Sequence, residues 1–283
     1  MQTHIDKHWQ RQPIRQAMIL AAGKGTRMRP LTLTTPKPLI KVGGRALIEW
    51  HILALRQAGI TDIVINAAWL ADKLQAGIGD GSRYGVNIRW SVEEKPLETA
   101  GGIAKALYEN QLKPEPFLLI NGDVWTRHPL DGLGKNAGLN HSQAVDDVAV
   151  LAHLLLVDNP KHNGAGDFIY HDGKVLMKPE HQKPEHQADH NSSEQAREQK
   201  TWTFAGISLL HPALFVDVPY DRPYPLAKVL KQAMMTRQVS AEIYDGIWVD
   251  VGTPERLAWV NDHLNNHLKQ SGFKQSGFKQ SNL

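Results

Sequence analysis

The chain has 283 residues, 41% of them hydrophobic and 22% charged, so it is long enough to bury a sizeable core. It contains no cysteine, which excludes disulfide bonds and thiolate metal sites and fits a cytoplasmic protein. The formal net charge is +3 with the two signs well mixed; a nucleic-acid binder usually shows a basic stripe, so this charge favours a small anionic ligand.

No segment of the sequence predicts contact with a membrane. Residues 1–16 lack the apolar run of a secretory signal, and no window approaches roughly 18 consecutive apolar residues. We therefore expect a cytoplasmic protein without a membrane span.

Apolar runs of strand type alternate with segments of helical spacing in the first half of the chain. The predicted strands are 17–21, 62–68, 86–92 and 116–123. The predicted helices are 45–59, 69–78 and 99–110, the last with Thr99 as N-cap. This alternation predicts an α/β fold with a parallel sheet covered by helices on both faces. Ligands then bind at the carboxyl ends of the strands.

The second half of the chain predicts further strands and two helices. The predicted strands are 148–157, 201–210, a hairpin over 168–177 that turns at Asp172-Gly173, and two short strands within 239–253. The predicted helices are 224–238 and a segment that opens at Thr253-Pro254 and ends near Leu268, since Thr before Pro is a typical helix start.

Two polar segments carry tandem repeats and cannot bury enough apolar surface to order themselves. Residues 178–200 contain KPEHQ twice, and the tail contains SGFKQ twice. We expect one domain over residues 17–268, with a mobile extension at 1–16, a mobile insert at 178–200 and a mobile tail at 269–283.

A glycine-containing loop with cationic residues follows the first predicted strand. Gly23 and Gly25 are two residues apart, and no Gly-Lys-Ser/Thr follows at the spacing of a P-loop. Met28 stands where a dinucleotide-binding fingerprint needs its third glycine, so neither motif fits. Prolines at 30, 36 and 38 oppose a long helix, so we expect an extended segment that wraps a polyphosphate chain, with Arg27 and Lys37 as cations.

Four motifs in order resemble the signature of the sugar-1-phosphate nucleotidylyltransferases. They are Leu20 to Thr32 with Pro36-Lys37-Pro38, Pro96 to Gly102, Asn121-Gly122-Asp123, and Asp250-Val251-Gly252-Thr253. The resemblance covers roughly residues 17–268. It implies a Rossmann-like mixed, mainly parallel sheet of the nucleotide-diphospho-sugar transferase type.

The resemblance also implies a reaction between UTP and a sugar 1-phosphate that gives a UDP-sugar and pyrophosphate. Arg27 would bind the β- and γ-phosphates, Lys37 would lie near the reacting phosphates, and Asp123 and Asp250 would hold Mg²⁺. Arg27, Lys37 and Asp123 are thus the expected catalytic residues. The other expected nucleotide-binding residues are Leu20, Ala21, Ala22, Gly23, Gly25, Thr26, Gly101 and Gly102.

Base recognition is expected from the segment 97–102. Gly101 and Gly102 are costly near the start of a helix, which indicates either a ligand or tight packing there. The sugar is expected at Asn121, Asp158, Gly166 and Asp167.

The sugar itself is predicted from smaller likenesses. The segments 66–70, 121–126, 157–160, 166–168 and 204–208 resemble uridylyltransferases that act on N-acetylmuramate 1-phosphate in peptidoglycan recycling. The alternatives are a mannose-1-phosphate guanylyltransferase, a glucose-1-phosphate thymidylyl- or uridylyltransferase, and an inactive nucleotide-sugar sensor of the same fold. A monomer and a dimer both remain open.

One departure from the family pattern concerns the sugar phosphate. Many larger relatives carry Glu-Lys-Pro after the metal aspartate, whereas Glu94-Lys95-Pro96 precedes Asp123 in this chain. The equivalent position falls at Gly166-Asp167-Phe168, which has no cation. The sugar phosphate must then be balanced by Mg²⁺, Lys37 or another cation.

Overall fold

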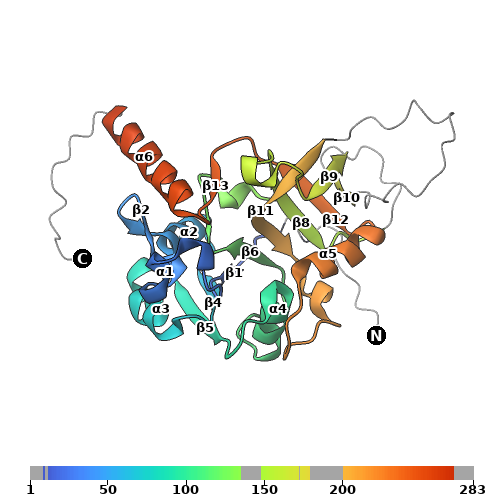
Figure 1. Ribbon diagram of the computed structural model, residues 1–283. Helices are drawn as coiled ribbons and strands as arrows, with labels where there is room; N and C mark the ends of the chain where they lie inside the picture. Colours follow the sequence, from blue (N-terminus) through green and yellow to red (C-terminus); the bar gives the residue numbers. More distant parts are fainter. Residues whose placement is uncertain (1–8, 10–11, 135–147, 172, 179–199, 271–283) are drawn as a thin grey trace, which may run out of the picture.

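A nine-stranded mixed sheet runs through the centre of the computed structural model, with helices on both faces (Figure 1). The structure describes residues 9, 12–134, 148–171, 173–178 and 200–270. Nearly all of the insert at 178–200 and most of the predicted tail lie outside the described residues.

The strand order is β5-β4-β1-β6-β11-β8-β12-β10-β9. Strands β5, β4, β1 and β6 are parallel, β11 is antiparallel to β6 and β8, and β8 and β12 are again parallel. The bounds are Asn87–Val92 (β5), Asp62–Ala67 (β4), Gln16–Leu20 (β1), Phe117–Asn121 (β6), Thr201–Leu210 (β11), Ala152–Val157 (β8), Val239–Ile243 (β12), Lys174–Met177 (β10) and Phe168–His171 (β9). The predicted mixed, mainly parallel sheet is confirmed.

Each face of the sheet is buried under its own pair of helices. Helices α2 (Leu47–Gln57) and α3 (Ala71–Ile78) cover one face, where their apolar side chains join those of β1 such as Ile19. Helices α4 (Glu98–Tyr108) and α5 (Leu226–Met235) cover the other face, where Met18 belongs to the second core cluster. Neighbouring residues of a strand point to opposite faces, so a continuous apolar run is what a sheet covered on both sides requires.

Two small sheets and the last helix form a third packing unit. Strand β2 (Lys41–Val42) pairs with β3 (Arg45–Ala46), and β7 (Val124–Thr126) pairs with β13 (Trp248–Asp250). Helix α6 (Pro254–Gln270) packs through Val260 and Leu264 against Val42 and Trp125. Pairing of β13 with β7 places Asp250 opposite Val124, and the Val251 amide donates to the Asp123 carbonyl at 2.8 Å.

The β1–β2 connection differs from the expected extended wrap, and that expectation is wrong. The connection contains three short helical turns, Thr26–Met28 (η2), Leu31–Thr34 (α1) and Lys37–Leu39 (η3). Proline is tolerated at the start of a helical turn because that position needs no intrahelical N–H bond, and Pro30 and Pro38 occupy such positions.

Other elements differ from the expectations at their ends. Helix α4 begins at Glu98, so Thr99 lies in its first turn and is not the N-cap. Helix α2 begins only at Leu47, because Arg45–Ala46 pair as β3. Within the expected extension 1–16, Trp9 is buried and its indole N–H donates to the Val150 carbonyl at 2.7 Å. Among the described residues, no helix is both long and apolar enough to cross a membrane.

Candidate active site

A cavity of about 420 Å³ lies at the carboxyl ends of the parallel strands β1, β4 and β6. Ten of the sixteen predicted site residues line it: Leu20, Ala21, Ala22, Gly23, Gly25, Thr26, Arg27, Lys37, Asn121 and Asp123. Eight more residues complete the lining: Pro38, Asn66, Glu93, Pro96, Glu98, Thr99, Gly122 and Gly252. The cavity therefore lies at the edge where the sheet topology predicts ligand binding.

Lys37 and Asp123 form a close ion pair on the side of the cavity that is lined by the glycine-containing connection between β1 and β2, residues 21–40 (the phosphate loop). The Lys37 Nζ lies 2.7 Å from Asp123 Oδ2, and the lysine side chain is only 10% exposed. Lys37 comes from the short turn η3, whereas Asp123 follows the end of β6. Asp123 therefore fixes the Lys37 ammonium at the place where the loop and the strand end meet.

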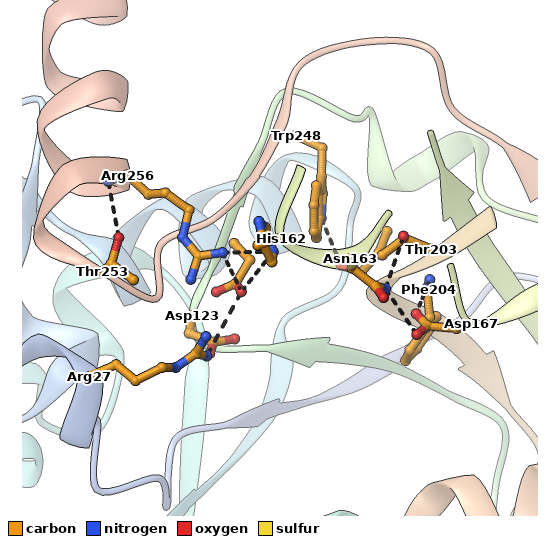
Figure 2. Close-up of polar contacts among 12 residues, drawn as sticks. Arg27, Asp123, His162, Asn163, Asp167, Thr203, Phe204, Trp248, Thr253 and Arg256 are labelled. Carbon is orange, nitrogen blue, oxygen red and sulfur yellow. Dashed lines mark hydrogen bonds and ion pairs between the residues drawn. The ribbon is translucent and has the colours of Figure 1, made fainter. Parts of the chain in front are cut away.

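A second charged cluster is centred on Asp250, at the end of β13. Its Oδ2 lies 3.1 Å from Arg256 Nη1, 3.6 Å from His162 Nε2 and 4.0 Å from Arg27 Nη2. Figure 2 shows Arg27, His162 and Arg256 pointing toward one another from three separate segments. Three basic side chains thus lie within 4.0 Å of the Asp250 carboxylate, beside the cavity.

His162 accepts a hydrogen bond in this cluster. Arg256 Nη1 lies 2.7 Å from His162 Nε2, and a guanidinium can only donate. Burial and then the charge of Arg256 lower the pKa of His162, although Asp250 opposes the shift. Both observations are consistent with a neutral imidazole whose unprotonated Nε2 accepts the hydrogen bond from Arg256.

Asn66 and Glu93 form a buried polar network at the opposite side of the cavity. Asn66 Oδ1 accepts from the Ala21 amide at 2.7 Å, and its Nδ2 donates to Glu93 Oε1 at 2.7 Å. Glu93 Oε2 accepts from the Leu97 amide at 2.9 Å. Burial raises the pKa of Glu93, although its hydrogen bonds oppose this rise. The network ties the first residue after β1 to the segment that opens α4.

This network was not predicted, although the sequence contains a signal for it. Asn66 closes the apolar run of β4, and Glu93 follows β5 immediately. A polar residue at the end of a buried parallel strand is a candidate for the ligand edge.

Gly101 and Gly102 do not line the cavity, whereas Glu98 and Thr99 of the same predicted segment do. A Cβ on Gly101 would lie 2.7 Å from the Arg222 carbonyl oxygen, and one on Gly102 would lie 2.7 Å from Glu93 Oε1. Of the two explanations given for these glycines, the structure shows tight packing.

Three of the residues expected at the sugar also lie outside the cavity lining, namely Asp158, Gly166 and Asp167. Asp158 is exposed and pairs with Lys200 at 2.7 Å. Asp167 Oδ1 accepts from Asn163 Nδ2 at 3.0 Å, and its Oδ2 accepts from the Phe204 amide at 2.8 Å (Figure 2). Both carboxylate oxygens of Asp167 therefore help to fix the loop before β9.

Asp123 and Asp250 fit a magnesium site by their chemistry and their placement. Both are oxygen donors, and they are brought together by the pairing of β13 with β7. Asp250 Oδ1 is buried and has no hydrogen-bond partner among the described residues, so it retains a free acceptor. The described residues contain no group of three or more His, Asp or Glu side chains that could hold a metal. Mg²⁺ needs only one or two carboxylates when phosphate oxygens and water complete its shell.

Comparison with known proteins decides the family of this chain. Residues 16–267 match the family model described as nucleotidyl transferase. The chain belongs to this family. Nucleotidyl transferases of this family generally use a divalent metal ion, in agreement with the two carboxylates.

Among similar proteins, an N-acetylmuramate alpha-1-phosphate uridylyltransferase of Neisseria meningitidis serogroup B is 43% identical over 86% of this chain and 95% of its own length. A mannose-1-phosphate guanyltransferase of Schizosaccharomyces pombe is 31% identical over 85% of this chain, which spans only 61% of that relative.

Two solved structures share the fold of this nucleotidyl transferase at low sequence identity. The inositol-1-phosphate CTP transferase from T. maritima superposes with a TM-score of 0.66 at 17% identity, over 92% of this chain and 98% of that one. HddC from Yersinia pseudotuberculosis, in complex with GMP-PN, superposes with a TM-score of 0.60 at 19% identity, over 88% of this chain and 99% of that one.

Proposed function

We propose that this nucleotidyl transferase transfers UMP from UTP to N-acetylmuramate α-1-phosphate, in the cytoplasm, as a step of peptidoglycan recycling. The observation that carries the proposal is the 43% identity to the Neisseria uridylyltransferase, which extends over 95% of that relative. The products are the UDP-sugar and pyrophosphate.

The reaction needs no nucleophile from the protein. A phosphate oxygen of the sugar 1-phosphate attacks the α-phosphorus of UTP, a new P–O bond forms, and the bond to the β-phosphate breaks as pyrophosphate leaves. Since the attacking group is already an anion, the protein's task is to hold two anions together and to stabilise the charge on the leaving group.

Different residues in and beside the cavity would bind the phosphates, the metal ion and the base. Arg27 would hold the β- and γ-phosphates through charge-assisted hydrogen bonds, and Lys37 would place a compact charge near the reacting phosphates. Asp123 and Asp250 would hold Mg²⁺, which supplies charge neutralisation to the phosphates when bound. The base would lie against Leu20 to Gly23 and the amino-terminal end of α4, where Asn66 and Glu93 fix the backbone.

A matrix of sugar 1-phosphates against UTP, dTTP and GTP, read by pyrophosphate release, tests the proposal. We expect the highest kcat/KM with UTP and N-acetylmuramate 1-phosphate, and background rates from Asp123→Asn. Activity that is absent with this pair but present with another would overturn the assignment of the sugar or the base.

The second candidate is a mannose-1-phosphate guanylyltransferase, favoured by the 31% identity to the S. pombe relative. It is the weaker candidate because the chain spans only 61% of that protein. A higher kcat/KM with mannose 1-phosphate and GTP than with N-acetylmuramate 1-phosphate and UTP would favour this second candidate. An inactive sensor is disfavoured because Arg27, Lys37, Asp123 and Asp250 are all present.

A further inference from the structure

The end of the cavity at Gly252 carries more positive charge than its carboxylate can balance. Two guanidinium groups, those of Arg27 and Arg256, share the single carboxylate of Asp250. A Cβ built on Gly252 would lie 2.3 Å from Arg256 Nη2 and 3.0 Å from Arg27 Nη2. Both cations therefore converge on a residue that lines the cavity.

The polar groups of this cluster are incompletely satisfied by the described residues. The Arg256 side chain is only 18% exposed, and its Nε is buried without a hydrogen-bond partner among these residues. A buried donor without a partner is costly, and in a native protein it calls for an explanation such as a bound water, an ion or a catalytic role.

His162 reaches the same cluster from a loop that is firmly held. Asn159 Nδ2 donates to Thr201 Oγ1 at 2.9 Å, while Asn163 Nδ2 bonds Asp167 Oδ1 at 3.0 Å. Asp167 thus anchors the loop, and the side chain that this loop directs toward Arg256 is His162 (Figure 2).

We propose that Arg256, with His162 beside it, binds an anionic oxygen of the sugar 1-phosphate, either of its phosphate or of a carboxylate on the sugar. This inference rests on the proposed function, in that the acceptor is a sugar 1-phosphate. It supplies a cation for the acceptor beside the cavity. The segment Gly166-Asp167-Phe168 has no cation of its own, and Lys178, whose Nζ donates to the Ala165 and Gly166 carbonyls, does not line the cavity. A guanidinium suits both groups, because it can offer two parallel N–H donors to phosphate or carboxylate oxygens.

The test compares Arg256→Lys, Arg256→Ala and His162→Gln with the wild type by steady-state kinetics in both substrates. We expect Arg256→Ala to raise the KM for the sugar 1-phosphate by roughly 10- to 100-fold while the KM for UTP changes less than about threefold. Arg256→Lys should recover part of the loss, and His162→Gln should give a smaller rise in the same KM.

Arg15→Ala is the matched control, since it removes one exposed arginine just before β1, at the opposite end of the strand from the cavity. Thermal unfolding of each variant shows whether it folds, and Arg256→Lys keeps the test usable if Arg256→Ala does not. Unchanged KM for the sugar 1-phosphate in both folded Arg256 variants, or a rise confined to UTP, overturns the inference.

A second acceptor separates the two anionic groups. If Arg256 binds the phosphate, Arg256→Lys raises KM equally for N-acetylmuramate 1-phosphate and N-acetylglucosamine 1-phosphate, which lacks the carboxylate. If Arg256 binds the carboxylate, the rise is confined to N-acetylmuramate 1-phosphate. All variants are compared with the wild type on the acceptor that the wild type uses best in the matrix, so the comparison of KM values remains valid if the sugar was assigned wrongly. If the wild type is inactive with every sugar 1-phosphate, the proposed function itself is contradicted.

Discussion

Gly252 is the residue at which the candidate site has no room for a side chain. An added methyl group would meet Arg256 Nη2, Asp250 Oδ1 and Arg27 Nη2 within 3.0 Å. The two arginine atoms are the far ends of flexible side chains, so they can move aside at little cost to folding. Their displacement would nevertheless disturb the charges that face the cavity.

We therefore expect Gly252→Ala to lower kcat/KM by at least about tenfold, the effect of losing one charge-assisted hydrogen bond, while the free energy of unfolding falls by less than about 1 kcal/mol. Pyrophosphate release and urea unfolding measure the two effects. Gly132→Ala is the matched control, because a Cβ there meets no atom within 4 Å. Wild-type turnover in Gly252→Ala would show that the positions of the Arg27 and Arg256 guanidinium groups do not matter for the reaction.

At the scale of elements, Glu242 of β12 joins strand β8 to the segment that follows β7. Its Oε2 lies 3.2 Å from His153 Nε2 on β8 and accepts from the Gly134 amide at 3.2 Å, while Oε1 lies 3.4 Å from His128 Nε2. Burial alone would raise the pKa of Glu242, but the hydrogen bonds from the two histidines and Gly134 outweigh it and lower the pKa to about 2. The ionised form of Glu242 therefore stabilises the folded state.

The sign of the pH dependence follows from this lowered pKa. The unfolded chain binds the proton at about pH 4.5 and the folded chain at about pH 2, so the stabilisation is complete above pH 4.5 and is lost as the pH falls toward 2. Its size is on the order of 3 kcal/mol, with more than half lost by about pH 3. Urea unfolding of wild type and Glu242→Gln should differ most near pH 7 and progressively less toward pH 3.

Glu109→Gln serves as the control for the pH experiment. Glu109 is a surface residue of the α4 terminus that pairs with Lys105 at 2.6 Å, and such pairs contribute little to stability. A difference between wild type and Glu242→Gln that stays constant from pH 7 to pH 3 would contradict the assigned pKa.

Elements with a strong local pattern were predictable from the sequence. The strands predicted at 17–21 and 116–123 correspond to β1 (Gln16–Leu20) and β6 (Phe117–Asn121) within two residues at each end, because burial on both faces demands continuous apolar residues. The phosphate loop was wrongly predicted as extended, because helical turns of three or four residues leave almost no periodic signal in the sequence, and the prolines alone favoured an extended chain.

The part of the candidate site that was not predicted from the sequence depends on tertiary packing. Arg256 and His162 are 94 residues apart in the chain and meet only because α6 docks beside the loop before β9. Neither residue lies in a local pattern that distinguishes it from a solvated surface side chain. The phosphate loop and the two aspartates could be found because they lie in recognisable motifs.

At the scale of the whole molecule, the cavity lies between the parallel strands of the first half and the start of α6. Lys37, Asp123 and Arg27 line the cavity, and Asp250 and Arg256 adjoin it across Gly252. A ligand that contacts both sides would link the first half of the sheet to the last helix. Ligand binding should therefore stabilise the molecule as a unit.

We expect UTP at about 100 times its Kd, with Mg²⁺ present, to add about 2.7 kcal/mol of stability. For a domain of this size that raises Tm by about 5–10 °C, at about 2–4 °C per kcal/mol. Differential scanning fluorimetry measures the shift, and EDTA should reduce it. Arg27→Ala should show a smaller shift than wild type, whereas Arg15→Ala should match wild type. Equal shifts in all three proteins would remove Arg27 from the nucleotide site.

The docking of α6 also has a consequence for the order in which the protein is made. The phosphate loop and β1 leave the ribosome early, whereas Asp250, Gly252 and Arg256 follow more than two hundred residues later, and α6 holds them through Val260 and Leu264. A nascent chain therefore lacks the complete charged cluster until α6 has been made. A chain cut before α6 would retain Asp250 and Gly252 but would lack Arg256, together with the packing of Val260 and Leu264 that holds this end of the cavity in place.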